Sequence, residues 1–371
     1  MCGIVGYVGY KPVVDILLDG LEQLEYRGYD SSGIAVKCTD SIKVYKAEGK
    51  LVNLREELAP HAYEISKATL GIGHIRWATH GAPTVVNAHP HTCGCGKLVV
   101  VHNGIIENYK ELKAELEAKG CQFRSQTDTE TVAHLIAMIY GEVKDLTKAV
   151  QLATKKIEGA YALGIMHNDE PNKLVVTKRN APLIIGVGEN EYYAASDVPA
   201  IIKHTNKAIY LKDNQVATLT PSSLKLEDEF GNEVIPKVEV LPWEPVALSK
   251  MGYKHFMLKE IHEQPDVIRN ILIGKLHTSD SPIVLNEVKL TKEHLRKLNR
   301  IQIIACGTSL HAAMVGKYII EAFCGIPVDV EPSSEYIYRK TVTDEHTLVI
   351  GVSQSGETAD TLTAIKQAKA K

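Results

Sequence analysis

The second residue of the chain, Cys2, combines two reactive groups if Met1 is removed. The cysteine would then carry both a thiol nucleophile and a free α-amine. An α-amine titrates near pH ~8 and a thiol near ~8.5, so a useful fraction of the amine is neutral and can take the thiol proton, directly or through one water. A structural interpretation stays open, because Cys2 can also be a small buried residue at the start of a Gly-rich strand.

Two later residues carry opposite charges, and each can pair with a charged group of a ligand. Arg76 ends an apolar, strand-like run, and its guanidinium can pair bidentately with a carboxylate. Asp128 precedes an apolar helix expected over residues 132–140 and can hold an ammonium group. The alternatives are an ordinary surface ion pair for Arg76 and helix capping by Thr127 or Asp128.

An apolar strand expected over residues 98–102 runs directly into Asn103 and Gly104. The Asn103 amide and the Gly104 N–H can point at one spot and so form an oxyanion hole. Asn-Gly is also the commonest signal of a tight hairpin. Against the hairpin, no partner strand follows at once, since residues 107–119 have the pattern of an amphipathic helix.

Two histidines and two cysteines, which are metal-ligand residue types, lie close together as His89, His91, Cys93 and Cys95. Zinc sites usually combine a Cys-x₂₋₄-Cys pair with a second, distant pair of ligands. Four ligands on one small loop do not form such a cage. We therefore predict no metal and no cofactor.

The last part of the chain has two polar loops with the composition of a phosphate site. Each follows a short apolar strand, expected at 301–305 and at 348–352, and each precedes a helix. Hydroxyls and backbone N–H groups at a helix N-terminus can hold phosphate without a cation, and ligands of parallel sheets bind at the carboxyl ends of strands. Ser and Thr are also ordinary N-caps, and the Gly-Lys-Ser/Thr ending of a Walker loop is absent.

The remaining pattern predicts the elements that must position these residues. Strands are expected over residues 1–10, 33–37, 42–47, 161–166, 173–176, 183–187, 192–196 and 208–219, with helices over 12–26, 145–157 and 254–273. This pattern favours an α+β domain with two packed sheets. Residues 301–371 read instead as strand, helix, strand, helix, strand, which indicates a parallel sheet.

Composition excludes several classes of protein. The chain has 371 residues, of which 44% are hydrophobic and 23% are charged, as in ordinary globular proteins. The net charge of −3 gives no electrostatic case for nucleic acid or an anionic membrane as a partner. No apolar run approaches the ~18 residues of a membrane span. Seven cysteines, an odd number, favour reduced thiols and a cytoplasmic location.

These segments together resemble the family of glutamine–fructose-6-phosphate aminotransferases (isomerising), also called glucosamine-6-phosphate synthases. The first part is similar to class II glutamine amidotransferases, an N-terminal-nucleophile (Ntn) family. The matching motifs are Cys2-Gly-Ile-Val-Gly, Tyr26-Arg-Gly-Tyr-Asp, Arg76-Trp-Ala-Thr-His-Gly, Val101-His-Asn-Gly, Thr127-Asp-Thr-Glu, Ala195-Ser-Asp, His255-Phe-Met-Leu-Lys-Glu-Ile, Ala305-Cys-Gly-Thr-Ser and Ser353-Gln-Ser-Gly-Glu-Thr.

The resemblance implies a fold and a division of the chain. The expected fold is an α+β N-terminal-nucleophile (αββα sandwich) glutaminase domain over residues 1–240 and an incomplete α/β parallel-sheet sugar isomerase (SIS) module over 291–371. A connector with a helix is expected over 241–290.

The resemblance also implies roles at a glutamine site. Cys2 would attack the side-chain amide of L-glutamine with its α-amine as the base, and Asn103 and Gly104 would stabilise the oxyanion. The substrate-binding residues implied are Arg76 for the α-carboxylate, Asp128 for the α-ammonium, Thr79 and His80 in a closing loop, Trp77 as a gate for ammonia, and Arg27 as part of the pocket wall.

A sugar-phosphate site is implied for fructose 6-phosphate, to which ammonia would pass inside the protein. The residues that match it are Thr308, Ser309, Ser353, Gln354, Ser355 and Thr358. Family members carry two SIS modules and this chain ends in the first, so the expectation is glutamine hydrolysis without synthesis of glucosamine 6-phosphate. Two explanations stay open: the sequence is truncated, or the gene is split and a second polypeptide supplies the missing module. A homo-oligomer is also expected.

Two competing functions remain open at this stage. An amidotransferase that feeds a phosphoribosyl site would need an acidic pair before a Gly-Thr phosphate loop, whereas this chain has the loop that begins at Ser353. A sugar-phosphate sensor with a vestigial Cys2 does not explain why Arg76, Asn103, Gly104 and Asp128 are all present.

Overall fold

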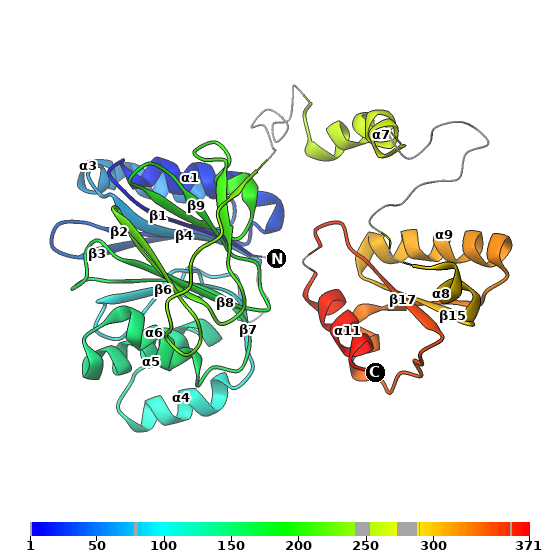
Figure 1. Ribbon diagram of the computed structural model, residues 1–371. Helices are drawn as coiled ribbons and strands as arrows, with labels where there is room; N and C mark the ends of the chain where they lie inside the picture. The colour runs from blue at the N-terminus through cyan, green and yellow to red at the C-terminus, as the bar shows by residue number, and fades with distance from the viewer. Residues whose placement is uncertain (1, 78–80, 242–252, 273–287, 289, 357) are drawn as a thin grey trace. The chain divides into compact units, whose positions relative to one another are not determined.

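The computed structural model describes residues 2–77, 81–241, 253–272, 288, 290–356 and 358–371. The chain divides into two compact units, Met1–Ser249 and Lys250–Lys371. Each unit has its own sheet or sheets and its own hydrophobic core (Figure 1). The domain boundaries expected from the sequence at residues 240 and 290 stay predictions.

The first unit contains two antiparallel sheets that pack face to face. Among its described residues, the larger sheet has the order β14 (Glu239–Val240), β11 (Lys207–Tyr210), β9 (Ile184–Val187), β10 (Tyr192–Ala195), β1 (Gly3–Val8), β4 (Leu70–Arg76), β2 (Ser31–Lys37) and β3 (Ile42–Glu48). The smaller sheet has the order β13 (Ser223–Glu227), β12 (Val216–Thr220), β8 (Leu174–Arg179), β7 (Gly159–His167), β6 (Leu98–Ile106) and β5 (His91–Thr92).

Helices cover the outer face of each sheet, which gives four layers (Figure 1). Those near the larger sheet are α1 (Val13–Gln23), η1 (Glu25–Arg27), α2 (Leu51–Leu58), η2 (Ala59–His61), α3 (Ala62–Ile65) and η3 (Val198–Ala200). Those on the smaller sheet are α4 (Tyr109–Ala118), α5 (Asp128–Val143) and α6 (Leu146–Thr154).

Alternation along the strands explains this layering. On β1, Ile4 packs between the two sheets while its neighbour Val5 packs under α1. On β6, Val99 faces the inter-sheet core while Val100 faces α5. Successive side chains of a strand point to opposite faces, so a strand that is apolar at every position must be covered on both sides.

Two strands differ from the sequence-based expectation. The run 208–219 is two strands, β11 and β12, because Asn214 adopts a left-handed conformation (φ 65°) in the turn between them. Strand β6 continues past Asn103 and Gly104 to Ile106, because it pairs with β7. The hairpin alternative for Asn103-Gly104 is therefore wrong.

Helix α5 begins at Asp128, four residues before the predicted start, and its capping differs from the expected pattern. The N-cap residue Thr127 makes no side-chain capping bond. Instead, the Glu130 carboxylate accepts hydrogen bonds from the backbone N–H groups of Arg124 and Ser125, at 2.9 and 2.6 Å. Burial opposes the charge of Glu130, but His134 and these N–H groups outweigh it and lower its pKa to about 2.

The second unit contains a parallel sheet, as the sequence predicted. Its described strands have the order β16 (Val328–Pro332), β15 (Arg300–Ala305), β17 (Thr347–Val352). Its described helices are α7 (Phe256–Leu272), α8 (Lys292–Lys297), α9 (Gly307–Cys324), α10 (Ser333–Tyr338) and α11 (Ala359–Lys369). In the part of the chain that the structure describes, no helix has the length and apolarity that a membrane span requires.

Candidate active site

Cys2 lies where β1 begins, beside the end of β4. The two strands are antiparallel with Gly3 opposite Ile75, so the residues after Ile75 run alongside Cys2. The Trp77 N–H donates a hydrogen bond to the Cys2 Sγ at 3.3 Å, and the thiol donates to the Trp77 carbonyl oxygen at 3.5 Å. Burial raises the pKa of the Cys2 thiol, although the Trp77 N–H and the nearby Arg76 guanidinium act to lower it. The thiol therefore needs a base before it can attack a substrate.

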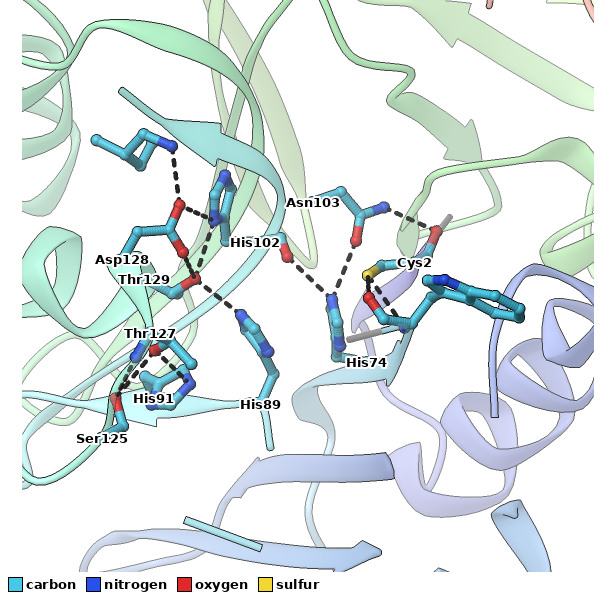
Figure 2. Close-up of polar contacts among 12 residues, drawn as sticks. Cys2, His74, His89, His91, His102, Asn103, Ser125, Thr127, Asp128 and Thr129 are labelled. Carbon is cyan, nitrogen blue, oxygen red and sulfur yellow. Dashed lines mark hydrogen bonds and ion pairs between the residues drawn. The ribbon is translucent and has the colours of Figure 1, made fainter. Parts of the chain in front are cut away.

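Asn103 approaches Cys2 from the other sheet (Figure 2). Its Nδ2 donates a hydrogen bond to the Cys2 carbonyl oxygen at 3.2 Å. The next residue, Gly104, has φ 131°, and a Cβ there would lie 2.0 Å from the Ala160 carbonyl oxygen. Only glycine fits this backbone position. The Asn-Gly pair thus presents an amide group and an exposed stretch of backbone next to the thiol-bearing residue.

Arg76 and Asp128 are both buried, with 3% and 7% of their surface exposed. The Arg76 guanidinium donates hydrogen bonds to the carbonyl oxygens of Ala82 and Gly81, at 3.1 and 3.3 Å. Burial lowers the pKa of Arg76, and the nearby Asp30 and Asp128 side chains oppose that shift. These two residues therefore bring opposite charges to the same region.

The Asp128 carboxylate connects helix α5 to strand β6. Its Oδ2 accepts a hydrogen bond from the Ile106 N–H at 2.8 Å. The same oxygen lies 4.0 Å from Nδ1 of His102. Because the backbone bond leaves other carboxylate lone pairs unused, Asp128 can both hold the helix start and meet a ligand.

Arg27 lies in η1 and contacts the residues after β10. Its Nη1 donates to the Ser196 carbonyl oxygen at 3.1 Å and to the Asp197 carboxylate at 2.9 Å. The Ser196 hydroxyl in turn accepts a hydrogen bond from the Ile4 N–H at 3.0 Å. Through Ser196, Arg27 therefore connects the segment after α1 to strand β1, which directly follows Cys2.

Two predicted site residues, Thr79 and His80, lie outside the described residues, as does Met1. Trp77 is described, is 47% exposed and meets the Tyr29 ring edge-on at 6.1 Å. The structure thus brings together Cys2, Arg76, Trp77, Asn103 and Asp128 within one unit.

A group of buried histidines lies between Asn103 and the start of α5 (Figure 2). His74 Nε2 is 3.0 Å from Asn103 Oδ1, and the His74 ring stacks on His89 at 4.1 Å. His89 and His102 both contact the Thr129 hydroxyl at 2.9 Å. The remaining member, His91, contacts the Thr127 hydroxyl at 3.0 Å.

Sequence reasoning missed His74 and considered His89 and His91 only as metal ligands. The sequence could have indicated a role for His74, because His74 and Arg76 lie two positions apart and so share one face of an otherwise apolar strand. Among the described residues, no group of three or more histidine, cysteine or acidic side chains could hold a metal. Cys93 and Cys95 instead lie with their sulfurs 2.8 Å apart.

The two polar loops of the second unit lie side by side. Strands β15 and β17 are parallel neighbours with Ala305 opposite Val352, so both loops leave the same edge of the sheet. Thr308 and Ser309 lie in the first turn of α9. Ser353 Oγ lies 3.0 Å from Thr358 Oγ1 and accepts the Gly356 N–H at 3.1 Å. The predicted residues Gln354 and Ser355 lie in this second loop.

Comparisons with known proteins match one domain family to each of the two units. The profile of the glutamine amidotransferase domain matches residues 83–203, and that of the SIS domain matches residues 294–371. A glutamine–fructose-6-phosphate aminotransferase (isomerizing) of Symbiobacterium thermophilum is 48% identical over 371 residues, which are 100% of this chain and 60% of that protein. The enzyme of the same name from Methanosarcina acetivorans is 48% identical over 376 residues, again 60% of its length.

Solved structures support the predicted fold class. The B. subtilis glutamine phosphoribosylpyrophosphate amidotransferase, solved with ADP and GMP, aligns with a TM-score of 0.54 at 21% identity, over 95% of this chain and 69% of its own. The fold class, an N-terminal-nucleophile sandwich followed by a parallel-sheet SIS module, is confirmed. With 48% identity along its whole length, the chain is similar to the glutamine–fructose-6-phosphate aminotransferases, and it spans about 60% of the length of the curated relatives it matches.

Proposed function

We propose that this chain hydrolyses L-glutamine to glutamate and ammonia, with Cys2 as the nucleophile. The observation that carries the proposal is the hydrogen bond of 3.2 Å from the Asn103 amide to Cys2. It puts a donor suited to an oxyanion beside a cysteine that can become the N-terminal residue. The match to the glutamine amidotransferase domain supports the same reaction.

The reaction begins, after removal of Met1, when the Cys2 α-amine takes the thiol proton. The sulfur then bonds to the amide carbon of glutamine, and the electron pair of the C=O bond moves to oxygen. Asn103 Nδ2 and the Gly104 N–H donate hydrogen bonds to that oxyanion. When the intermediate collapses, the C–N bond breaks and the ammonium of Cys2 returns its proton to the leaving nitrogen, so ammonia departs. Water, deprotonated by the same amine, hydrolyses the thioester and releases glutamate.

Charge pairing accounts for substrate choice in this proposal. Arg76 binds the α-carboxylate and Asp128 the α-ammonium of glutamine, so a peptide-bound glutamine is excluded because it lacks both free groups. Thr79 and His80 close over the substrate, and Trp77 controls the passage of ammonia. Arg27 shapes the pocket through its contacts with the residues after β10.

The SIS module is the proposed acceptor site, with fructose 6-phosphate as the sugar and glucosamine 6-phosphate as the product. The proposed phosphate-binding residues are Thr308, Ser309, Ser353, Gln354, Ser355 and Thr358. The hydroxyls of the Ser and Thr residues, the Gln354 amide and the N-termini of α9 and α11 suit a phosphate group. The family match over the full chain supports this assignment. In this scheme, residues 1–240 act as the glutaminase, 241–290 connect, and 291–371 bind the sugar.

We also propose that the chain forms a homo-oligomer and works in a reducing, cytoplasmic compartment. Large apolar side chains are exposed along α9: Met314, Val315, Tyr318, Ile319 and Phe323. Their burial in a second copy would remove an apolar surface from water. All seven cysteines are free, as expected for reduced thiols.

The test is glutamate release by the wild-type chain and by Cys2→Ala. We expect the variant to lose turnover by a factor of at least about 10³, because the proposed thioester forms on the Cys2 sulfur. Cys95→Ala, which removes an exposed cysteine elsewhere in the same unit, should keep wild-type turnover. Turnover by Cys2→Ala at the wild-type rate would contradict the proposal.

A further inference from the structure

His74 forms a hydrogen bond that joins the two sheets of the first unit. It lies on β4 of the larger sheet and is fully buried, with 0% of its surface exposed. Its Nε2 lies 2.9 Å from the His102 carbonyl oxygen and 3.0 Å from Asn103 Oδ1, both on β6 of the smaller sheet. The amide of Asn103, the proposed oxyanion donor, is therefore contacted through its oxygen by His74 of the other sheet (Figure 2).

The partners of His74 determine which ring nitrogen carries the proton. A backbone carbonyl oxygen can only accept a hydrogen bond, so the contact with His102 requires a proton on Nε2. Burial lowers the pKa of His74 to about 3, which keeps the ring neutral at working pH. A neutral ring has one N–H, so Nδ1 is left as a bare nitrogen, and this buried atom has no hydrogen-bond partner among the described residues.

The same donor and acceptor rules determine the orientation of the Asn103 amide group. Its oxygen must face the Nε2–H of His74, because an NH₂ group there would oppose donor to donor. Its NH₂ group must face the Cys2 carbonyl oxygen at 3.2 Å, because an oxygen there would oppose acceptor to acceptor. Two backbone carbonyls, at His102 and Cys2, thus specify one orientation of the amide through His74.

The ring of His74 is itself held in place. His89 stacks on it with ring centroids 4.1 Å apart and 25° between the planes. His89 in turn is fixed by its contact with the Thr129 hydroxyl at 2.9 Å. Rotation of His74 would break this stack and both bonds to β6.

We propose that His74 is a positioning residue of the glutamine site, which holds the Asn103 amide with its NH₂ group toward Cys2 and the oxyanion. The inference rests on the proposed glutamine hydrolysis and deepens it. Without the Nε2–H, the amide can turn over and present its oxygen to the developing negative charge. The loss then falls on the transition state and not on the binding of glutamine, which Arg76 and Asp128 carry.

The first test compares two substitutions of His74 with a control substitution of another buried histidine, His134. His74→Leu removes the donor, and we expect kcat for glutamine to fall about 10- to 100-fold, less than the ~10²–10³-fold of deleting an oxyanion donor outright, with KM within about twofold. His74→Gln places an amide N–H near the former Nε2 and should recover at least tenfold of that loss. His134→Leu, a histidine of similar burial beside Phe123 and Glu130, should keep the wild-type kcat.

A double-mutant cycle separates positioning from a general structural effect. If His74 acts through Asn103, His74→Leu should cost nothing further in an Asn103→Ala background. An equal fall of kcat in both backgrounds would overturn the proposal. So would a rise of KM without a change of kcat, or the same kcat in His74→Leu as in the wild type.

A measurement on the unaltered chain covers the case in which His74→Leu does not fold. Nitrogen-15 NMR of the histidine rings should show His74 as the Nε2–H tautomer at pH 7, and an Nδ1–H tautomer would contradict the proposal. Failure of the underlying function looks different. A wild-type chain without glutamine turnover, but with the Nε2–H tautomer, would contradict glutamine hydrolysis and leave the hydrogen-bond assignment standing.

Discussion

The amide nitrogen of Asn103 lies 3.2 Å from the carbonyl oxygen of Cys2, although 101 residues separate the two in the sequence. Asn103 lies on β6 of the smaller sheet, and Cys2 directly precedes β1 of the larger sheet. The packing of those two sheets therefore builds the site, since neither sheet alone contains both the nucleophile and the donor.

Removal of the Asn103 amide should slow the chemical step. We expect Asn103→Ala to lower kcat for glutamine by about 10²–10³, or about 3–4 kcal/mol of transition-state stabilisation, with little change in KM. Steady-state glutaminase assays measure both constants. Asn108→Ala is the matched control, because Asn108 caps a neighbouring turn through Lys156 and Glu158 and lies outside the site. An unchanged kcat in Asn103→Ala would remove Asn103 from the oxyanion hole.

Neutralising Asp128 should weaken glutamine binding. Asp128→Asn keeps an acceptor for the Ile106 N–H but loses the charge that pairs with the substrate ammonium. We expect KM to rise about 10- to 100-fold, as for the loss of a charged hydrogen bond, with kcat within a few-fold. Asp145→Asn is the matched control, because it makes the same substitution at the N-cap of another helix, α6, and should keep the wild-type KM. Wild-type KM in Asp128→Asn would show that another group meets the ammonium.

Gly104 should tolerate no side chain. Gly104→Ala combines φ 131° with a Cβ 2.0 Å from the Ala160 carbonyl oxygen. We expect a loss of about 2–4 kcal/mol in the free energy of unfolding. Gly96→Ala has a positive φ of 71° but open space around the Cβ, and should lose only about 1 kcal/mol. Urea denaturation compares the two, and equal losses would mean that the backbone relaxes at Gly104.

The buried histidines make the first unit sensitive to acid. Burial lowers the pKa of His74, His89, His91 and His102 in the folded state. Below pH ~6.5 the unfolded chain therefore binds more protons than the folded one, so the free energy of unfolding falls as pH drops. Each such histidine contributes about 1.4 kcal/mol per pH unit.

Denaturation at a series of pH values between 7.5 and 5 tests this dependence. In His74→Gln, the pH slope should be shallower by the contribution of one histidine, because glutamine does not titrate. Stability that stayed constant, or rose, as the pH fell through 6.5 would contradict the assignment of neutral buried rings.

Local pattern predicted much of the fold. The sequence predicted the strand that contains Val101, and it predicted the two polar loops after Ala305 and Val352. Both predictions were possible because strand periodicity and loop composition are local properties. The apolar helix over residues 132–140 was readable for the same reason. The division into a two-sheet unit and a parallel-sheet unit followed from the order of these elements.

Contacts between distant segments were not predictable. The path of β6 through Asn103 and Gly104 depends on its pairing with β7, which begins at Gly159. The role of Glu130 as an acceptor for Arg124 and Ser125, in place of a cap by Thr127, depends on how the loop before α5 folds. His74 was overlooked because its partners on β6 become visible only when the two sheets are packed.

The most direct test of the central claim is the intact mass of the purified chain before and after reaction with a glutamine-analogue electrophile, with peptide mapping of the adduct. The account predicts a mass without Met1 and a single label on Cys2, and it predicts that excess glutamine protects Cys2 from the label. A retained Met1 with no label on Cys2 would contradict it, because the nucleophile would then have neither its base nor a working pocket.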